Sequence, residues 1–165
     1  MDPDRTDDWR KFIAEFRGET DRGCALLGPA LIDDELKAIL LHYLIDRPPS
    51  RKLFAGPAAP LGALSARSSL AYALGVISTE EYESITVLRK IRNEFAHKTM
   101  GLSFDSPNVI KLLKTLPIAK AGAQRPEETT RQRFEITVAV LIYNLFGRRS
   151  RLTELGIAAR EFNKI

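Results

Sequence analysis

The sequence is poor in the residues that build covalent or metal-bound cross-links. Its 165 residues include one cysteine, Cys24, and two histidines, His42 and His97. A single cysteine excludes an internal disulfide, and so few thiol and imidazole groups argue against a structural zinc site. We therefore expect no bound metal and no cofactor.

The chain also lacks a long hydrophobic run and an export signal. Its most apolar stretch, Phe134 to Phe146, is too short to cross a bilayer and contains Glu135 and Asn144. The first residues, Met1 to Asp4, are acidic, whereas a secretory signal begins with basic residues followed by apolar ones. These absences predict a cytoplasmic protein without a transmembrane segment.

Charge is distributed unevenly along the chain. The net charge is +4, yet residues 1–46 contain 11 acidic and 6 basic side chains, which gives −5 and leaves +9 for the remainder. Such asymmetry is compatible with a nucleic acid, RNA or DNA, lying on one face. The alternative is an ordinary solvated surface, because lysines and arginines scattered over helices usually have no partner.

Hydrophobic residues recur at helical spacing along most of the chain, and strand-like alternation is hard to find. Ser78 and Glu81 have the spacing of a capping box at the start of one helix, and Gly101 marks its end. The pattern therefore predicts an all-α fold, a single-domain bundle of about five or six helices. Helices are expected at 7–16, 20–45 with a kink at Gly28–Pro29, 61–74, 78–101, 108–116 and 130–146, with loops at 46–60 and 117–129.

We expect one domain, 1–165, with three parts. These are an N-terminal helix extension at 1–19, a core bundle at 20–147 and a basic C-terminal tail at 148–165.

The most informative motif is the run from Arg92 to His97 at the end of a predicted helix. It brings a fixed cation, the amide of Asn93 and a titratable imidazole within about two helical turns, a set of groups suited to a phosphate. Asn93 and His97 are four apart, so the amide can orient the imidazole. Arg92 and His97 are five apart, about 140° around the helix. To act together, Arg92 must wrap round, the helix must loosen, or a second subunit must contribute.

Two resemblances rest on these segments. The stretches Pro60 to Arg67, Ala71 to Ile77 and Glu81 to Glu83 resemble the mannitol operon repressor family of bacterial regulators. The phrase Arg92-Asn93-x-x-x-His97 is similar to the Arg-x4-6-His signature of the HEPN superfamily, the higher eukaryote and prokaryote nucleotide-binding proteins. The first resemblance covers roughly residues 20–100, whereas the second rests on three residues in an all-α context.

The resemblances imply different functions. The repressor family implies a helical, often dimeric regulator, and no segment of the chain reads as a helix-turn-helix with a basic recognition helix. The HEPN superfamily implies a homodimer with a composite, metal-independent ribonuclease centre. By that resemblance Arg92 binds phosphate, His97 acts as acid or base, and Asn93 orients the imidazole.

The chemistry of such a centre suits these side chains. Cleaving RNA without a metal requires deprotonation of the 2′-OH, stabilisation of the charged phosphate and protonation of the leaving oxygen. An imidazole with a pKa near 6.5 suits both proton transfers, and a guanidinium offers a planar fork of donors to phosphate oxygens. The alternative is a helix-end histidine near the last carbonyls and an arginine paired with a carboxylate.

Other cations are candidate nucleic-acid contacts, each with a structural alternative. Arg67 can line a groove beside the helix that begins at Ser78, or simply pack between helices. Lys98 has Glu94 four residues before it, the spacing of a surface ion pair. The cluster Arg148, Arg149 and Arg151 can grip phosphates or stabilise a helix C-terminus through its dipole. His42 and Cys24 are expected to be structural.

The main functional prediction is a regulator with a HEPN-like fold, acting on nucleic acid as a homodimer through an endoribonuclease-type site. Its context would be RNA processing or a toxin or defence system. The alternatives are a non-catalytic transcriptional repressor and a module that binds a protein partner such as an antitoxin.

Overall fold

The computed structural model describes residues 3–56, 58–98, 100–117 and 128–161, and every regular element within these ranges is an α-helix. This confirms the predicted all-α, single-domain fold. The helices are α1 (Pro3–Gly18), α2 (Asp21–Tyr43), α3 (Pro48–Lys52), α4 (Leu64–Ala73), α5 (Thr79–His97), α6 (Pro107–Leu113) and α8 (Thr130–Glu154).

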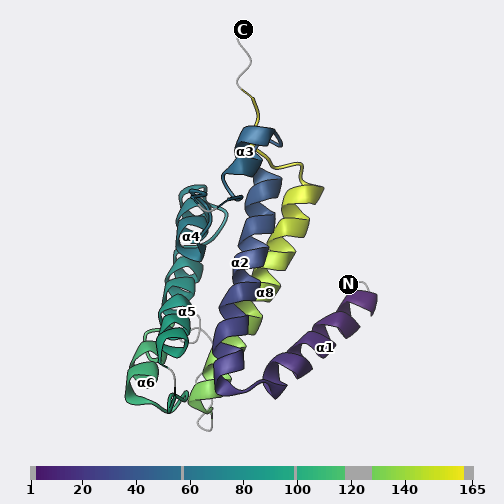
Figure 1. Cartoon of the computed structure of the whole chain (residues 1–165). Helices are drawn as coiled ribbons and strands as arrows, with labels where there is room; N and C mark the ends of the chain where they lie inside the picture. The colour runs from purple at the N-terminus through teal and green to yellow at the C-terminus, as the bar shows by residue number, and fades with distance from the viewer. Residues whose placement is uncertain (1–2, 57, 99, 118–127, 162–165) are drawn as a thin grey trace.

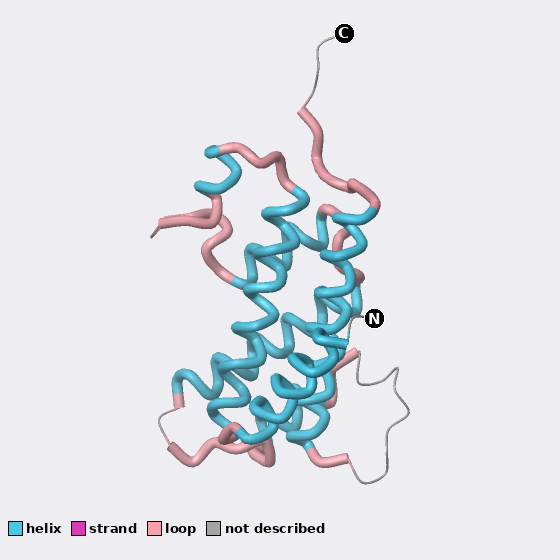
Figure 2. Tube along the Cα trace, turned by 90° about the vertical axis from the view of Figure 1, so that its right-hand side faces the viewer, coloured by secondary structure: helices cyan, strands magenta, loops and turns pink. Residues whose placement is uncertain are grey.

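The two longest helices, α2 and α8, lie side by side and run in the same direction, as Figure 1 shows. α4 and α5 cover one side of α2, and α6 packs below against α5 and α8. α1 meets the bundle at its C-terminal end, while its first turns diverge from it (Figure 1). The turned view in Figure 2 shows the C-terminal segment leaving from the end opposite α6. The arrangement leaves one long side of α5 facing away from α2.

Side-chain caps fix where the long helices begin. The predicted capping box of α5 is present: Ser78 N donates to Glu81 Oε2 at 2.8 Å, and Glu81 N donates to Ser78 Oγ at 3.2 Å. The same device, with Thr129 and Gln132, starts α8. Each box satisfies backbone N–H groups that a helix start otherwise leaves without a partner.

The core is apolar and close-packed. Phe104 lies between two other buried phenylalanines, with ring centroids 5.3 Å from Phe95 and 4.9 Å from Phe134. These contacts join α5 and the segment after it to α8, which is the longest helix. Aromatic pairs at such distances add to the stability that burial already gives.

A cluster of polar contacts surrounds Arg131 at the end of the bundle where α2 and α8 begin. Its guanidinium pairs with Glu135 at 2.7 Å and Asp21 at 3.0 Å, and donates to the carbonyls of Arg17 and Glu19 at 2.9 and 2.6 Å. The hydrogen bond to Glu135 is the main reason that the pKa of Arg131 is raised. One side chain thereby ties the α1–α2 connection to α8.

Cys24 lies in the core of α2 with no exposed surface. Burial, followed by the nearby carboxylate of Glu135, raises the pKa of its thiol to about 12. The prediction that Cys24 is a small structural core residue agrees with this placement.

Several helix ends differ by a few residues from the sequence-based expectation, and two differences are larger. The proline-rich loop contains the single turn α3, because proline suits the first helical position. α8 continues through Glu154, so Arg148, Arg149 and Arg151 lie on the helix and not in a tail beyond it. α2 runs through Pro29 as one helix, in agreement with the single helix predicted at 20–45. Most of the predicted loop at 117–129 lies outside the described residues. No helix of the described ranges is long and apolar enough to span a membrane.

Gly28 lies at a close contact between α2 and α8, and replacing it tests that packing. A Cβ at Gly28 would lie 2.9 Å from Val138 Cγ2 and 3.3 Å from Phe16 Cζ. We expect Gly28→Ala to lower the free energy of unfolding by about 1–3 kcal/mol, the usual cost of overpacking. Urea denaturation measures this.

Gly147 provides the matched control for that experiment. It lies inside α8, and a Cβ there would meet nothing within 4 Å. Gly147→Ala should therefore raise stability by about 0.5–1 kcal/mol through helix propensity. Equal effects at both glycines would contradict the packing argument.

Candidate functional site

The predicted site residues lie at the C-terminal end of α5. The helix stays regular to its last residue, His97, because Lys98 N still donates to Glu94 O at 3.1 Å. Loosening of the helix, one of the three alternatives for bringing Arg92 and His97 together, is therefore not seen. At about 100° per residue, Arg92 and His97 project about 140° apart, so one chain does not aim them at a common point.

Asn93 does not orient the imidazole within one chain. Its Oδ1 accepts a hydrogen bond from Arg92 Nη1 at 3.2 Å, and no bond between Asn93 and His97 occurs among the described residues. Arg92 and His97 are exposed, and Asn93 is half-buried. The three side chains thus remain accessible to an external partner, without forming a finished catalytic centre.

Arg67 is a structural residue, which corrects its assignment to a nucleic-acid surface. It is 7% exposed, and its guanidinium pairs with Asp33 of α2 at 2.6 Å. It also donates to the carbonyl of Leu61 at 2.8 Å. These contacts anchor α4 and the preceding loop to α2, and they leave the Arg67 side chain almost no exposed surface for a phosphate.

Arg148 and Arg149 are also engaged by carboxylates. Arg148 Nη1 lies 2.7 Å from Oε2 of Glu81, the residue that completes the capping box of α5. Arg149 Nη1 lies 3.4 Å from Glu35 of α2, and its guanidinium carbon is 5.1 Å from the centre of the Phe146 ring. Each arginine fastens α8 to a neighbouring helix, so its charge is largely neutralised.

The remaining predicted contacts are more accessible. Lys98 is exposed and lies 3.7 Å from Glu94, and its carbonyl oxygen accepts a hydrogen bond from Arg22. Arg151 is exposed and has no carboxylate partner among the described residues. Arg151 is therefore the only member of the 148–151 cluster that presents an unneutralised charge.

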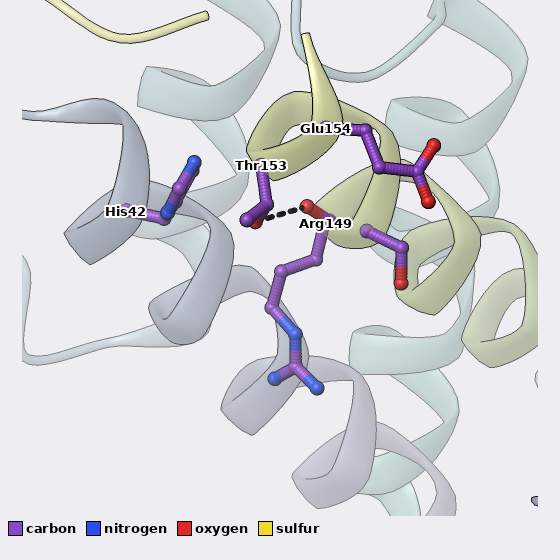
Figure 3. Close-up of a pocket in the computed structure, with 5 residues that line it drawn as sticks. His42, Arg149, Thr153 and Glu154 are labelled. Atoms are coloured by element: carbon purple, nitrogen blue, oxygen red, sulfur yellow. Dashed lines mark hydrogen bonds between the residues drawn. The ribbon is translucent and has the colours of Figure 1, made fainter. Parts of the chain in front are cut away.

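A pocket of about 380 Å³ lies between the C-terminal ends of α2 and α8. Figure 3 shows His42 approaching from α2, with Arg149, Thr153 and Glu154 on α8; Ser150 completes the lining. Thr153 Oγ1 donates to Arg149 O at 3.1 Å, so its hydroxyl is partly committed to the helix. His42 is half-buried, which agrees with its interpretation as a structural residue, but nothing local in the sequence indicates that two helix ends meet beside it.

No group of three or more metal-ligating side chains occurs among the described residues. The described residues thus define a class of protein by fold, a small all-α bundle whose helices are joined by ion pairs.

Comparison with known proteins places the chain within that class. The sequence profile described as "Mannitol repressor" matches residues 52–149, well over half of the chain. The chain belongs to the mannitol repressor family, which confirms the first resemblance. No curated protein sequence matches it significantly.

One solved structure shows the same fold. A chain in the X-ray structure of the MtlR–HPr complex from Escherichia coli superposes with a TM-score of 0.67 at 19% identity. The match covers 83% of this chain and 97% of that chain. At 19% identity, this structural likeness establishes the fold alone. The HEPN resemblance has no counterpart in these comparisons.

Glu81 is the residue whose replacement tests the link between α5 and α8. It is 4% exposed and serves both the capping box and Arg148. Glu81→Ala removes a cap and leaves a partly buried guanidinium without its partner, so we expect a loss of about 2–4 kcal/mol in the free energy of unfolding. Thermal and urea denaturation measure this loss.

Glu80→Ala is the control, because Glu80 is exposed in the same helical turn. Its effect should stay within about 0.5 kcal/mol. A Glu81→Ala protein as stable as the Glu80→Ala protein would show that the pair does not hold the two helices together.

Proposed function

We propose that the chain is a non-catalytic regulator that acts by binding a protein, and that its partner is HPr. The supporting observation is the fold match, which extends over 97% of a chain from a complex with HPr. Membership of the mannitol repressor family agrees with a regulatory role. A protein-contact mechanism also fits a surface on which Arg92 and His97 diverge and form no catalytic centre within one chain.

Isothermal titration of the purified chain with HPr from the same organism tests this proposal. We expect saturable binding with a dissociation constant on the order of micromolar, the range of many transient regulatory complexes. Size-exclusion chromatography with light scattering then gives the mass of the complex and of the free chain. Absence of saturation with both folded proteins at about 100 µM would reject HPr as the partner.

A second candidate function is metal-independent cleavage of RNA, and one observation favours it. Arg92, Asn93 and His97 are all accessible, and Arg92 has no carboxylate partner among the described residues. Because the two functional side chains diverge on one helix, this function requires a homodimer in which each subunit supplies part of the centre.

Incubation of a mixed RNA pool with the protein in EDTA tests the second function. His97→Ala should reduce cleavage by a factor of about 10²–10⁴, the usual contribution of a general acid or base. Product ends should be 2′,3′-cyclic phosphates. His42→Ala, which changes the other histidine, should leave cleavage unchanged. Equal cleavage by both variants, or none by the wild type, excludes a His97-dependent ribonuclease.

A further inference from the structure

The outward side of α5 forms one continuous polar face. Tyr82, Thr86, Arg89, Asn93 and His97 follow spacings of three and four residues, so they lie on one side of the helix. Lys90 and Arg92 lie on opposite flanks of this line, because residues two apart point about 160° apart around the helix axis. All seven side chains are exposed or half-buried. We call this surface the α5 face.

The cations of the α5 face lack carboxylate partners. Arg89, Lys90 and Arg92 form no ion pair among the described residues. Within the helix, the positions three and four residues from Arg89 and from Arg92 hold no acid. Glu94 lies four residues after Lys90 but pairs with Lys98 at 3.7 Å.

Arginines elsewhere in the fold behave differently. Most of them contact a carboxylate within 4.0 Å, and the pairs often join two helices. On the α5 face, in contrast, Arg89 and Arg92 are three residues apart, a spacing at which like charges destabilise a helix. A bound anion would relieve this repulsion.

An aromatic pair extends the α5 face at its N-terminal end. Tyr82 stacks on Tyr72 of α4, with ring centroids 5.1 Å apart and planes at 28°. Tyr72 OH lies 3.4 Å from Thr79 Oγ1, and Tyr82 OH lies 3.5 Å from Ser69 Oγ. Tyr72 remains 44% exposed, so the paired rings offer an aromatic surface about 10 Å along the helix from Arg89.

We propose that the α5 face binds single-stranded nucleic acid, a function beyond the regulator–HPr interaction and independent of cleavage. Arg89, Lys90 and Arg92 contact backbone phosphates, and a base stacks on Tyr72. Guanidinium groups favour this role because they donate two hydrogen bonds to one phosphate. A combination of unpaired cations and an exposed aromatic surface is what sequence-tolerant single-strand binding requires. An acidic protein surface would use the cations but not the stacked rings.

Fluorescence anisotropy with labelled 12-nucleotide oligo(U) and oligo(dT), at several NaCl concentrations, tests the proposal with the full chain. Three phosphate contacts predict a slope of log K against log[salt] of about −2 for the wild type. The triple variant Arg89→Gln, Lys90→Gln, Arg92→Gln should lose at least tenfold in affinity and most of the slope.

A second triple variant controls for net charge. Lys11→Gln, Lys37→Gln, Lys52→Gln removes the same three charges from α1, α2 and α3, and its affinity should stay within about twofold of the wild type. Tyr72→Ala should weaken binding about fivefold or more without changing the slope, whereas Tyr72→Phe should bind like the wild type. Circular dichroism confirms that each variant folds, and the single change Lys90→Gln replaces the triple variant if that protein unfolds.

Three results would overturn the proposal. The wild type does not bind either oligonucleotide at low salt, both triple variants lose affinity equally, or a polyglutamate peptide binds more tightly than the oligonucleotides at the same salt. The last result would assign the α5 face to an acidic protein partner.

Discussion

The carboxylate of Glu81 connects two requirements of the fold that are usually met by separate groups. Its Oε2 accepts from the backbone N–H of Ser78 and from Arg148, so the same atom defines where α5 begins and how α5 meets α8. Because the group is almost fully buried, neither contact can be exchanged for water without cost. This contact joins the start of α5 to α8, while α5 packs along its length against α2.

Similar ion pairs hold several other arginines of the bundle within the fold, so their charges are largely neutralised. Arg67 pairs with Asp33 between α4 and α2, and Arg149 pairs with Glu35 between α8 and α2. Arg131 joins α8 to the α1–α2 connection. Positive charge that appears clustered in the sequence is therefore mostly internal to the fold. Arg89 and Arg92 of α5, like Arg151 of α8, form no ion pair among the described residues, although α5 also carries four glutamates.

The sequence allowed the fold to be predicted well, because helical periodicity and the Ser78–Glu81 capping pattern are local signals. The continuation of α8 to Glu154 was missed because residues 147–154 are mostly polar and carry little periodicity. The role of Arg67 could not be predicted either. Its partner Asp33 lies 34 residues earlier in the chain, and only tertiary packing brings the two side chains to 2.6 Å.

The candidate site was predicted only in part for the same reason. Arg92, Asn93 and His97 are on one accessible helix end, as their spacing indicated, but helical geometry separates them in direction. The carboxylates that pair with Arg148 and Arg149 belong to other helices. The spacing of the two arginines in the sequence therefore did not reveal that both are paired. The family resemblance, which rests on a longer stretch, was the more reliable guide.

The burial of Cys24 has a consequence for the conditions in which the protein works. A thiol with no exposed surface and a pKa of about 12 is almost entirely protonated at neutral pH and out of reach of oxidants. Since no other cysteine exists in the chain, the folded protein offers no reactive thiol. Thiol–disulfide exchange is therefore not a means of controlling the folded protein, and the exposed Met100 is a sulfur that an oxidant can reach.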